Sequence, residues 1–206
     1  MRYNGPKNRI ARRENMDLGM KTPGSKAHAS LLKKINILPG QHGTKGRRKK
    51  SEHSRQLREK QKLRYSFGIT ETQLKNYFGM ASKRRGNTSV NLSEILERRL
   101  DNIIYRLGFA PTRAAARQLV SHGHVAVNGK SVKAASYQVA DSDAITFANE
   151  NTKKIPYIEA YMTQTEVILP EWLQVKKDAG TLVSTPNSSL IEKQVNLRLV
   201  IEYYSR

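Results

Sequence analysis

The order of apolar and polar residues predicts helices in the first part of the chain. A helix is expected over residues 51–67, with Ser51 as its cap and Gly68 at its end. Thr70 opens a capping-box pattern and starts the next helix. Apolar residues between 31 and 35 indicate one helix more, and no stretch of this part alternates as a strand would.

Further along the chain, helices are followed by strands. A helix is expected over residues 91–107, opened by the capping-box pair Asn91 and Glu94 and closed by Gly108. Thr112 caps a shorter helix after it. The middle of the chain therefore reads as two helices leading into a sheet.

The strand pattern centres on Asn128-Gly129, a strong signal for a tight hairpin turn. The expected strands are 125–127, 130–132 and 144–147, with a second hairpin made by 172–175 and 181–184 around 176–180. Asn196 is placed to cap a last helix, whose apolar stripe we assign to core packing. All of these strands are short, as in a small antiparallel sheet.

These elements predict an α+β fold in three segments. Residues 1–88 form a basic helical N-terminal domain, 89–160 a small module of helices and an antiparallel sheet, and 161–206 a hairpin and a helix. The last part is expected to pack back on the N-terminal domain. With 206 residues, of which 37% are hydrophobic and 26% charged, the chain can form a core and still expose much polar surface.

Several classes of site and partner are excluded by composition. The chain has no cysteine, so it has no disulfide and no thiolate-ligated zinc or iron–sulfur site, which suits a reducing compartment. No apolar run approaches the roughly 20 residues that span a bilayer. The first six residues also lack the apolar core of a secretory signal. We expect no membrane partner.

Charge is concentrated in the first third of the chain. The formal net charge is +20, and residues 1–64 hold 19 Lys and Arg against 4 Asp and Glu. The residues from 134 onward hold 7 basic and 9 acidic side chains. A single basic run is usually a solvated face, but a basic arm joined to a balanced body is typical of nucleic-acid binders.

The densest basic stretch, residues 45–50, follows the turn-rich loop 39–43, whose glycines would let the backbone approach a ligand. A nuclear-localisation signal is the alternative interpretation of this stretch. The helix over 51–67 has more cations than apolar residues, so it is expected to bury little and to follow a phosphate backbone.

Four motifs of the middle segment resemble the RNA-binding domain named after ribosomal protein S-four. They are LERRLDN at 96–102, YRLGFA at 105–110, ARQLV at 116–120 and HGHVAVNG at 122–129. That domain occurs in several families. The segments GPK at 5–7, PGQHG at 39–43, LREKQKLR at 57–64 and VIEYYSR at 200–206 extend the resemblance to the bacterial-type S-four ribosomal protein family.

This resemblance implies a structural protein of the small ribosomal subunit, in the cytoplasm or in an organelle. Such proteins bind small-subunit ribosomal RNA early, at a multi-helix junction in its 5′ region, and seed assembly of the subunit body. They neighbour ribosomal protein S-five and the path by which mRNA enters, and some repress their own operon. Many members carry metal-binding cysteines in the N-terminal segment. The matching positions near Asn8 and Ala11 are not cysteines in this chain, so no metal or cofactor is expected here.

One triplet and one pair of histidines in the middle segment suggest an enzyme or a metal site as an alternative. The triplet at 99–101 is similar to the one around the catalytic aspartate of pseudouridine synthases, but no glycine precedes it. Asp101 is better explained as a partner in an ion pair on the helix surface. His122 and His124 have no third ligand in view and suit hydrogen bonds to phosphate or base better than zinc. We therefore expect that the protein is not an enzyme.

The residues expected to bind RNA come from both the arm and the module. In the arm and its helices they are Arg9, Arg12, Arg13, His42, Lys45, Arg47, Arg48, Lys49, Lys50, Arg55, Arg58, Lys62, Arg64, Lys83, Arg84 and Arg85. In the module they are Arg99, Arg113, Arg117, Gln118, His122, His124 and Lys130. Except for Gln118, these residues are expected to share one surface with Arg106. A tRNA-handling or stress-related protein with the same domain, and a DNA-binding architectural protein, are the alternative functions.

Overall fold

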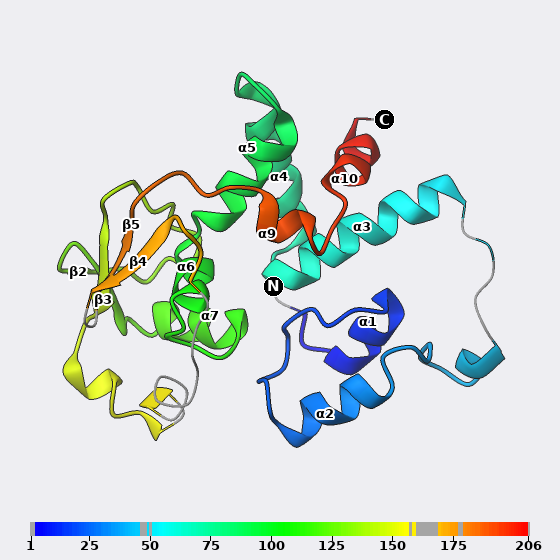
Figure 1. Ribbon diagram of the computed structural model, residues 1–206, viewed down its shortest axis with the longest axis horizontal. Helices are drawn as coiled ribbons and strands as arrows, with labels where there is room; N and C mark the ends of the chain where they lie inside the picture. Colours follow the sequence, from blue (N-terminus) through cyan, green and yellow to red (C-terminus); the bar gives the residue numbers. More distant parts are fainter. Residues whose placement is uncertain are drawn as a thin grey trace. The chain divides into compact units, whose positions relative to one another are not determined.

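The computed structural model describes residues 3–45, 49, 51–156, 158–159, 169–176 and 179–205. Contacts between its residues divide the chain into two units, which Figure 1 shows in sequence colours. Unit 1 holds residues 1–89 and 189–206, and unit 2 holds 90–188. Of the segment 161–206, whose last part was expected to pack on the N-terminal domain, the hairpin lies in the sheet of unit 2 and the last helix belongs to unit 1.

Unit 1 is helical over its described residues. Its elements are α1 (Lys7–Glu14), α2 (Lys26–Lys33), η1 (Gly43–Lys45), α3 (Glu52–Phe67), α4 (Glu71–Lys83), α9 (Ser189–Glu192) and α10 (Leu197–Tyr204). Ser51 caps α3 by accepting a hydrogen bond from the Ser54 N–H, and Gly68 ends that helix with φ 62°. The capping box at Thr70 is formed as predicted. Local capping chemistry therefore fixes both ends of α3 and the start of α4.

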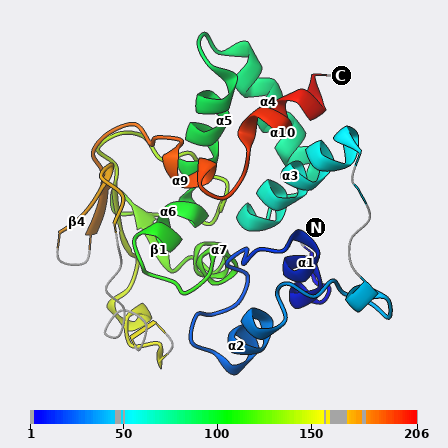
Figure 2. The same cartoon turned by 45° about the vertical axis from the view of Figure 1, so that its right-hand side comes forward.

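The face of α3 against α10 corrects the expectation that this helix buries little. Leu63 and Phe67 of α3 are buried, and so are Leu197 and Val200 of α10. The helix α10 packs against α3, and Figure 2 shows the two helices near one another. Lys60 of α3 is also buried and pairs with Glu71 at 2.6 Å. The thin apolar stripe suffices because a helix distant in sequence covers it.

The N-terminal segment buries several apolar side chains. The helix α1, which the sequence did not predict, follows Pro6 as N-cap and buries Ile10 and Ala11. Leu18 and Leu31 are buried as well. α2 begins earlier than expected because the Ser25 side chain caps it. Apolar burial in this segment is therefore larger than its basic composition suggests.

Unit 2 is formed by helices and one antiparallel sheet. Its elements are α5 (Thr88–Glu97, whose first two residues belong to unit 1), α6 (Leu100–Arg106), α7 (Arg113–Ser121), β1 (Val125–Val127), β2 (Lys130–Ser131), β3 (Ala144–Phe147), η2 (Glu150–Thr152), β4 (Leu173–Lys176) and β5 (Ala179–Leu182). The strand order is β2-β1-β3-β5-β4. Thr112 caps α7, and Asn128 and Gly129 form the tight turn with φ 50° and 77°. The predicted α+β class is confirmed.

The helix expected over 91–107 is in fact two helices. α5 begins at Thr88, three residues before the predicted cap, and the chain breaks at Arg99 before α6. At the break, the N–H groups of Leu100 and Asp101 donate to the carbonyls of Tyr137 and Ala135. Because a distant loop supplies these partners, the periodicity of the sequence could not reveal the break.

The second hairpin is displaced from its predicted place by Gly180. This residue lies inside β5 rather than in a loop, and it pairs with Val175 and Ile145 in the sheet. A Cβ at Gly180 would overlap the side chain of Leu107. Glycine is therefore required by close packing of the strand on α6 and its end, not by a turn.

Candidate nucleic-acid interface

In unit 2, a buried carboxylate holds two arginines. Asp101 and Arg99 are each 2% exposed, and Arg99 donates to Asp101 from Nε at 3.0 Å and from Nη2 at 2.7 Å. Arg117 of α7 reaches the same carboxylate with Nε at 2.8 Å. Asp101 thus ties the break between α5 and α6 to α7, with the bidentate geometry that arginine favours.

A second buried carboxylate extends this network. Glu97 is fully buried and accepts from Arg106 at 3.2 Å and 2.7 Å, and from the Asn102 amide. Asn102 in turn accepts from Arg113 Nε at 2.9 Å. The guanidinium of Arg113 also lies over the Tyr105 ring, 4.5 Å from its centroid. The network ends in two half-buried guanidinium groups, those of Arg106 and Arg117.

Positive charge exceeds negative charge within this network. Burial and the neighbouring charge of Arg106 lower the pKa of Arg113 to about 10, although Tyr105, Glu97 and Asp101 act in the opposite direction. Arg113 therefore remains protonated at neutral pH. Four guanidinium groups against two carboxylates, with Arg113 held by an amide and an aromatic ring, leave a surplus of positive charge beside the surface, which favours an anionic ligand.

Two parts of the predicted surface are wrong. Arg99 and Arg113 are buried at 2% and 8% exposure, so they do not belong to an exposed face. Asp101 is in an ion pair, but the pair is buried rather than on the helix surface. In the sequence these residues look like surface charges on a helix. Their burial depends on where the 134–139 loop and α7 pack.

Other predicted residues of unit 2 do lie at its surface. Gln118, His122 and Lys130 are exposed, and His124 is half-buried with its ring nitrogen 3.2 Å from the Thr152 hydroxyl. The rings of His122 and His124 stack, with centroids 6.2 Å apart. The end of α7 and the β1–β2 hairpin therefore expose polar hydrogen-bonding groups close together in the chain.

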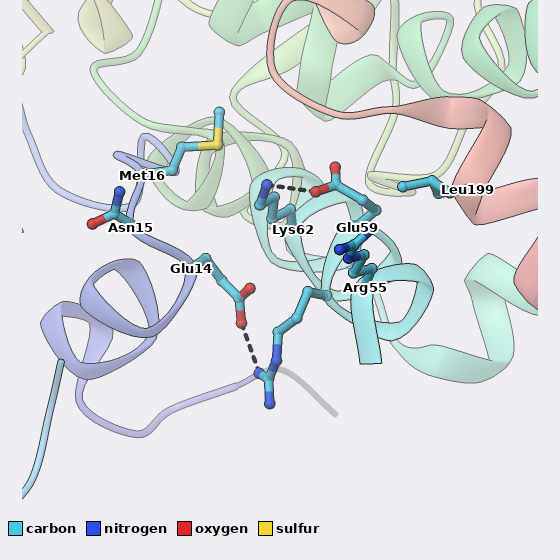
Figure 3. Close-up of a pocket in the computed structure, with 8 residues that line it drawn as sticks. Glu14, Asn15, Met16, Arg55, Glu59, Lys62 and Leu199 are labelled. Carbon is cyan, nitrogen blue, oxygen red and sulfur yellow. Dashed lines mark hydrogen bonds and ion pairs between the residues drawn. The ribbon is translucent and has the colours of Figure 1, made fainter. Parts of the chain in front are cut away.

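In unit 1, three of the predicted residues on α3, Arg55, Arg58 and Lys62, line a pocket of about 500 Å³ (Figure 3). We call it the α1–α3 pocket. It is lined by Glu14, Asn15, Met16, Arg55, Arg58, Glu59, Lys62 and Leu199. The residues from the end of α1 face the side of α3 that carries Arg55, Glu59 and Lys62. Asn15 makes this approach possible by ending α1 in the left-handed conformation, at φ 56°.

Most charges that line the pocket have internal partners. Arg58 donates to Glu14 at 3.0 Å, and Lys62 lies 2.6 Å from Glu59. Arg55 is different, because its side chain is 57% exposed and lies 3.6 Å from an equally exposed Glu52. Elsewhere on α3, Arg64 is committed to Glu71 and to the Tyr65 ring. One face of α3 thus combines ion pairs with an accessible cation.

The N-terminal arm uses one of its arginines internally. Arg12 donates to the carbonyl oxygens of Ile37 and Leu38, both at 2.9 Å, whereas Arg9 and Arg13 on the same helix are exposed.

A Cβ at Gly43, in the turn-rich loop before the basic stretch, would overlap the Leu38 carbonyl. The glycine expected to admit a ligand is therefore required by the chain's own backbone.

The remaining predicted residues of unit 1 are exposed or fall outside the described residues. His42, Lys45, Lys49, Lys83, Arg84 and Arg85 are exposed. Arg47, Arg48 and Lys50 lie outside the described residues. Sequence reasoning missed Glu14, Met16 and Leu199 of the pocket. No local signal could have found them, since the end of α1 (Glu14 and Met16) and α10 (Leu199) lie far apart in the sequence and line the pocket only in the folded chain.

In the part of the chain that the structure describes, no three His, Asp or Glu side chains gather closely enough to hold a metal ion. Within the same part, no helix is both long and apolar enough to cross a bilayer.

Comparisons with known proteins agree with this arrangement of a helical N-terminal part and a helix–hairpin module. The family described as the ribosomal protein S4/S9 N-terminal domain matches residues 2–97, and the S4 domain matches residues 98–145. The chain is 43% identical over 208 residues to proteins of two bacteria, Xanthomonas campestris pv. campestris (strain B100) and Xanthomonas oryzae pv. oryzae (strain PXO99A). Both relatives are called small ribosomal subunit protein uS4, and the match covers 100% of this chain and 99% of each.

Proposed function

Because the chain belongs to the uS4 family of small ribosomal subunit proteins, we propose that it binds small-subunit ribosomal RNA through one basic surface on each unit. The family is structural and non-enzymatic, and its S4 domain binds RNA. The observation that carries the proposal is the distribution of exposed cations. They lie on α1, at the end of α4 and near the β1–β2 hairpin, while acidic groups are largely engaged within the protein.

The two surfaces bind in different ways. The exposed cations of unit 1 track phosphates and release counterions, so they supply affinity with little base readout. In unit 2, the buried network holds Arg106 and Arg117 in place, and Gln118, His122 and Lys130 are exposed on the same unit. Held in this way, such groups lose little side-chain entropy on binding. A-form RNA, which displays phosphates and 2′-hydroxyls, suits both surfaces.

The contacts proposed for RNA are the accessible members of the predicted set. They are Arg9, Arg13, His42, Lys45, Lys49, Arg55, Lys83, Arg84, Arg85, Gln118, His122 and Lys130, joined by the half-buried Arg12, Arg58, Lys62, Arg64, Arg117 and His124. Arg47, Arg48 and Lys50 are proposed on sequence alone. Arg99 and Arg113 are left out because burial keeps them from a phosphate.

The wider role follows from the family. We propose that the protein binds a multi-helix junction in the 5′ region of the RNA and nucleates assembly of the subunit body. In the subunit it lies beside ribosomal protein S-five and the path by which mRNA enters, where it affects translational accuracy. Repression of its own operon and a cytoplasmic or organellar ribosome belong to the same proposal.

The test is binding to a fragment of the RNA's 5′ region across a range of salt concentrations. The affinity is expected to fall steeply with salt, and the Arg9→Ala, Arg13→Ala double variant is expected to reduce the slope by about 2. Arg198→Ala is the control, since Arg198 is an exposed arginine outside the proposed surfaces. A flat salt response, or tighter binding to duplex DNA or tRNA than to the fragment, would contradict the proposal.

A further inference from the structure

The α1–α3 pocket contains a carboxylate with unused hydrogen-bonding capacity. Glu14 is 2% exposed at its side chain, and its Oε1 accepts from Arg58 at 3.0 Å. Its other oxygen, Oε2, is buried and has no hydrogen-bond partner among the described residues. A buried acceptor without a donor is unfavourable, so Glu14 is suited to receive one more N–H group.

The edge of the pocket supplies a positive charge for the same ligand. Arg58 and Lys62 are held by Glu14 and Glu59, whereas Arg55 is more than half exposed and its contact with Glu52 is long. An arginine in this position can bind a phosphate at the rim without breaking a buried ion pair.

The walls and the size of the pocket favour a ring over a simple anion. Met16 and Leu199 give it apolar surface on two sides, from the end of α1 and from α10 (Figure 3). Its volume of about 500 Å³ is typical of sites for small organic molecules and is far more than a phosphate ion requires.

We propose that the α1–α3 pocket binds an unstacked RNA nucleotide whose base carries an amino group. The amino group donates to Glu14 Oε2, the base lies against Met16 and Leu199, and Arg55 contacts the phosphate. Because the described side chains close Oε2 from solvent, one of them moves as the base enters, and the unbranched Met16 is the most adaptable. The inference rests on the proposed RNA binding and adds to it a site that reads a base.

Cytidine and uridine monophosphate provide the test, because cytidine has an amino donor where uridine has a carbonyl acceptor, and the N3–H of uridine lies between two carbonyl oxygens that the carboxylate of Glu14 repels. Each nucleotide, and inorganic phosphate, would be titrated into the full chain labelled with ¹³C at its methionine methyl groups. The Met16 signal is expected to shift with cytidine monophosphate at about tenfold lower concentration than with uridine monophosphate. The signal of Met80, which is exposed on α4, serves as the reference for folding and for nonspecific effects.

Two variants separate the roles of the lining residues. In Glu14→Gln the amide can either donate or accept, so the preference for cytidine monophosphate is expected to disappear. In Arg55→Gln both nucleotides are expected to bind several-fold more weakly while the preference persists.

The inference is overturned if neither nucleotide shifts Met16, if inorganic phosphate shifts it as much, or if Glu14→Gln keeps the preference. Failure here is distinguishable from failure of the proposed function, because the salt dependence of RNA binding is tested separately through Arg9 and Arg13, which do not line this pocket.

Discussion

Several residues that would be surface cations by composition are internal parts of this protein. Arg99 and Arg113 are buried in unit 2, and Lys60 is buried in unit 1. Each is compensated by a carboxylate, an amide or an aromatic ring at close distance. A buried charge is tolerated only with such partners, so the carboxylates are as important to the fold as the cations.

Asp101 provides a direct test of this point. The change Asp101→Asn is expected to lower the free energy of unfolding by about 3–5 kcal/mol, because two arginines lose a shared buried counter-charge. Urea unfolding would measure the loss. Asp141→Asn is the control, since Asp141 is exposed and pairs with Arg98 at the surface, where an ion pair contributes at most about 1 kcal/mol. Equal losses in the two variants would refute the assignment.

Glu71 makes the stability of unit 1 depend on pH in the acid range. Its partial burial alone would raise the pKa, but hydrogen bonds from Lys60 and the Tyr204 hydroxyl, with the charges of Lys60 and Arg64, hold it below the ordinary 4.5. The lowered pKa means that this stabilisation is present above the ordinary value and is lost as pH falls through the folded-state pKa. Burial and the bond to Glu71 correspondingly raise the pKa of Tyr204.

The expected result is a smaller loss of stability on acidification in Glu71→Gln than in the wild type. Urea unfolding from about pH 6 to about pH 3 would show it. Glu150→Gln, which removes an exposed carboxylate of unit 2, should follow the wild-type curve. Parallel curves for wild type and Glu71→Gln would show that the ionised carboxylate of Glu71 does not stabilise unit 1.

At the scale of elements, local capping sets where most helices begin, and packing sets where strands and breaks occur. α3, α4, α7 and α10 begin next to the predicted caps Ser51, Thr70, Thr112 and Asn196. The break before α6 and the place of β5 follow instead from contacts with the 135–137 loop and with Leu107.

A pair of glycine substitutions tests whether tertiary packing requires glycine at position 180. Gly180→Ala is expected to destabilise by about 1–3 kcal/mol, because the added methyl overlaps the buried Leu107. Gly79→Ala lies inside α4 with open space around it and is expected to stabilise by about 0.5–1 kcal/mol. Thermal unfolding would compare the two variants, and shifts of the same sign would contradict the packing argument.

At the scale of the whole molecule, the chain leaves unit 1 within α5, builds unit 2 and returns for its last helices. The return covers the apolar face of α3 with Leu197 and Val200 and brings Tyr204 to Glu71. The stability of unit 1 therefore depends on residues from both ends of the sequence.

Deletion of residues 189–206 tests this dependence. Hydrogen exchange is expected to become much faster in α3 and α4, because their partner α10 is lost, and to change less in the sheet of unit 2. The shorter deletion of the last two residues, beyond the end of α10, is the control and should leave protection in α3 nearly unchanged. Equal loss of protection in both units would show that the chain unfolds as one body.

The sequence by itself determined what depends on neighbouring residues. The caps, the Asn128-Gly129 turn, the β3 strand, the α+β class and the concentration of charge in the first third are readable because their causes lie within a few positions. The family resemblance rests on motifs of the same kind, and the comparisons confirm it.

Only the tertiary structure decided which charges are buried and which are accessible. Arg117 meets Asp101, and Arg58 meets Glu14, across gaps in sequence that no local pattern encodes. Desolvation acts on a side chain through everything that packs around it. For that reason fewer cations are accessible at the surface of this protein than its composition suggests. The α1–α3 pocket likewise exists only once α1, α3 and α10 have come together.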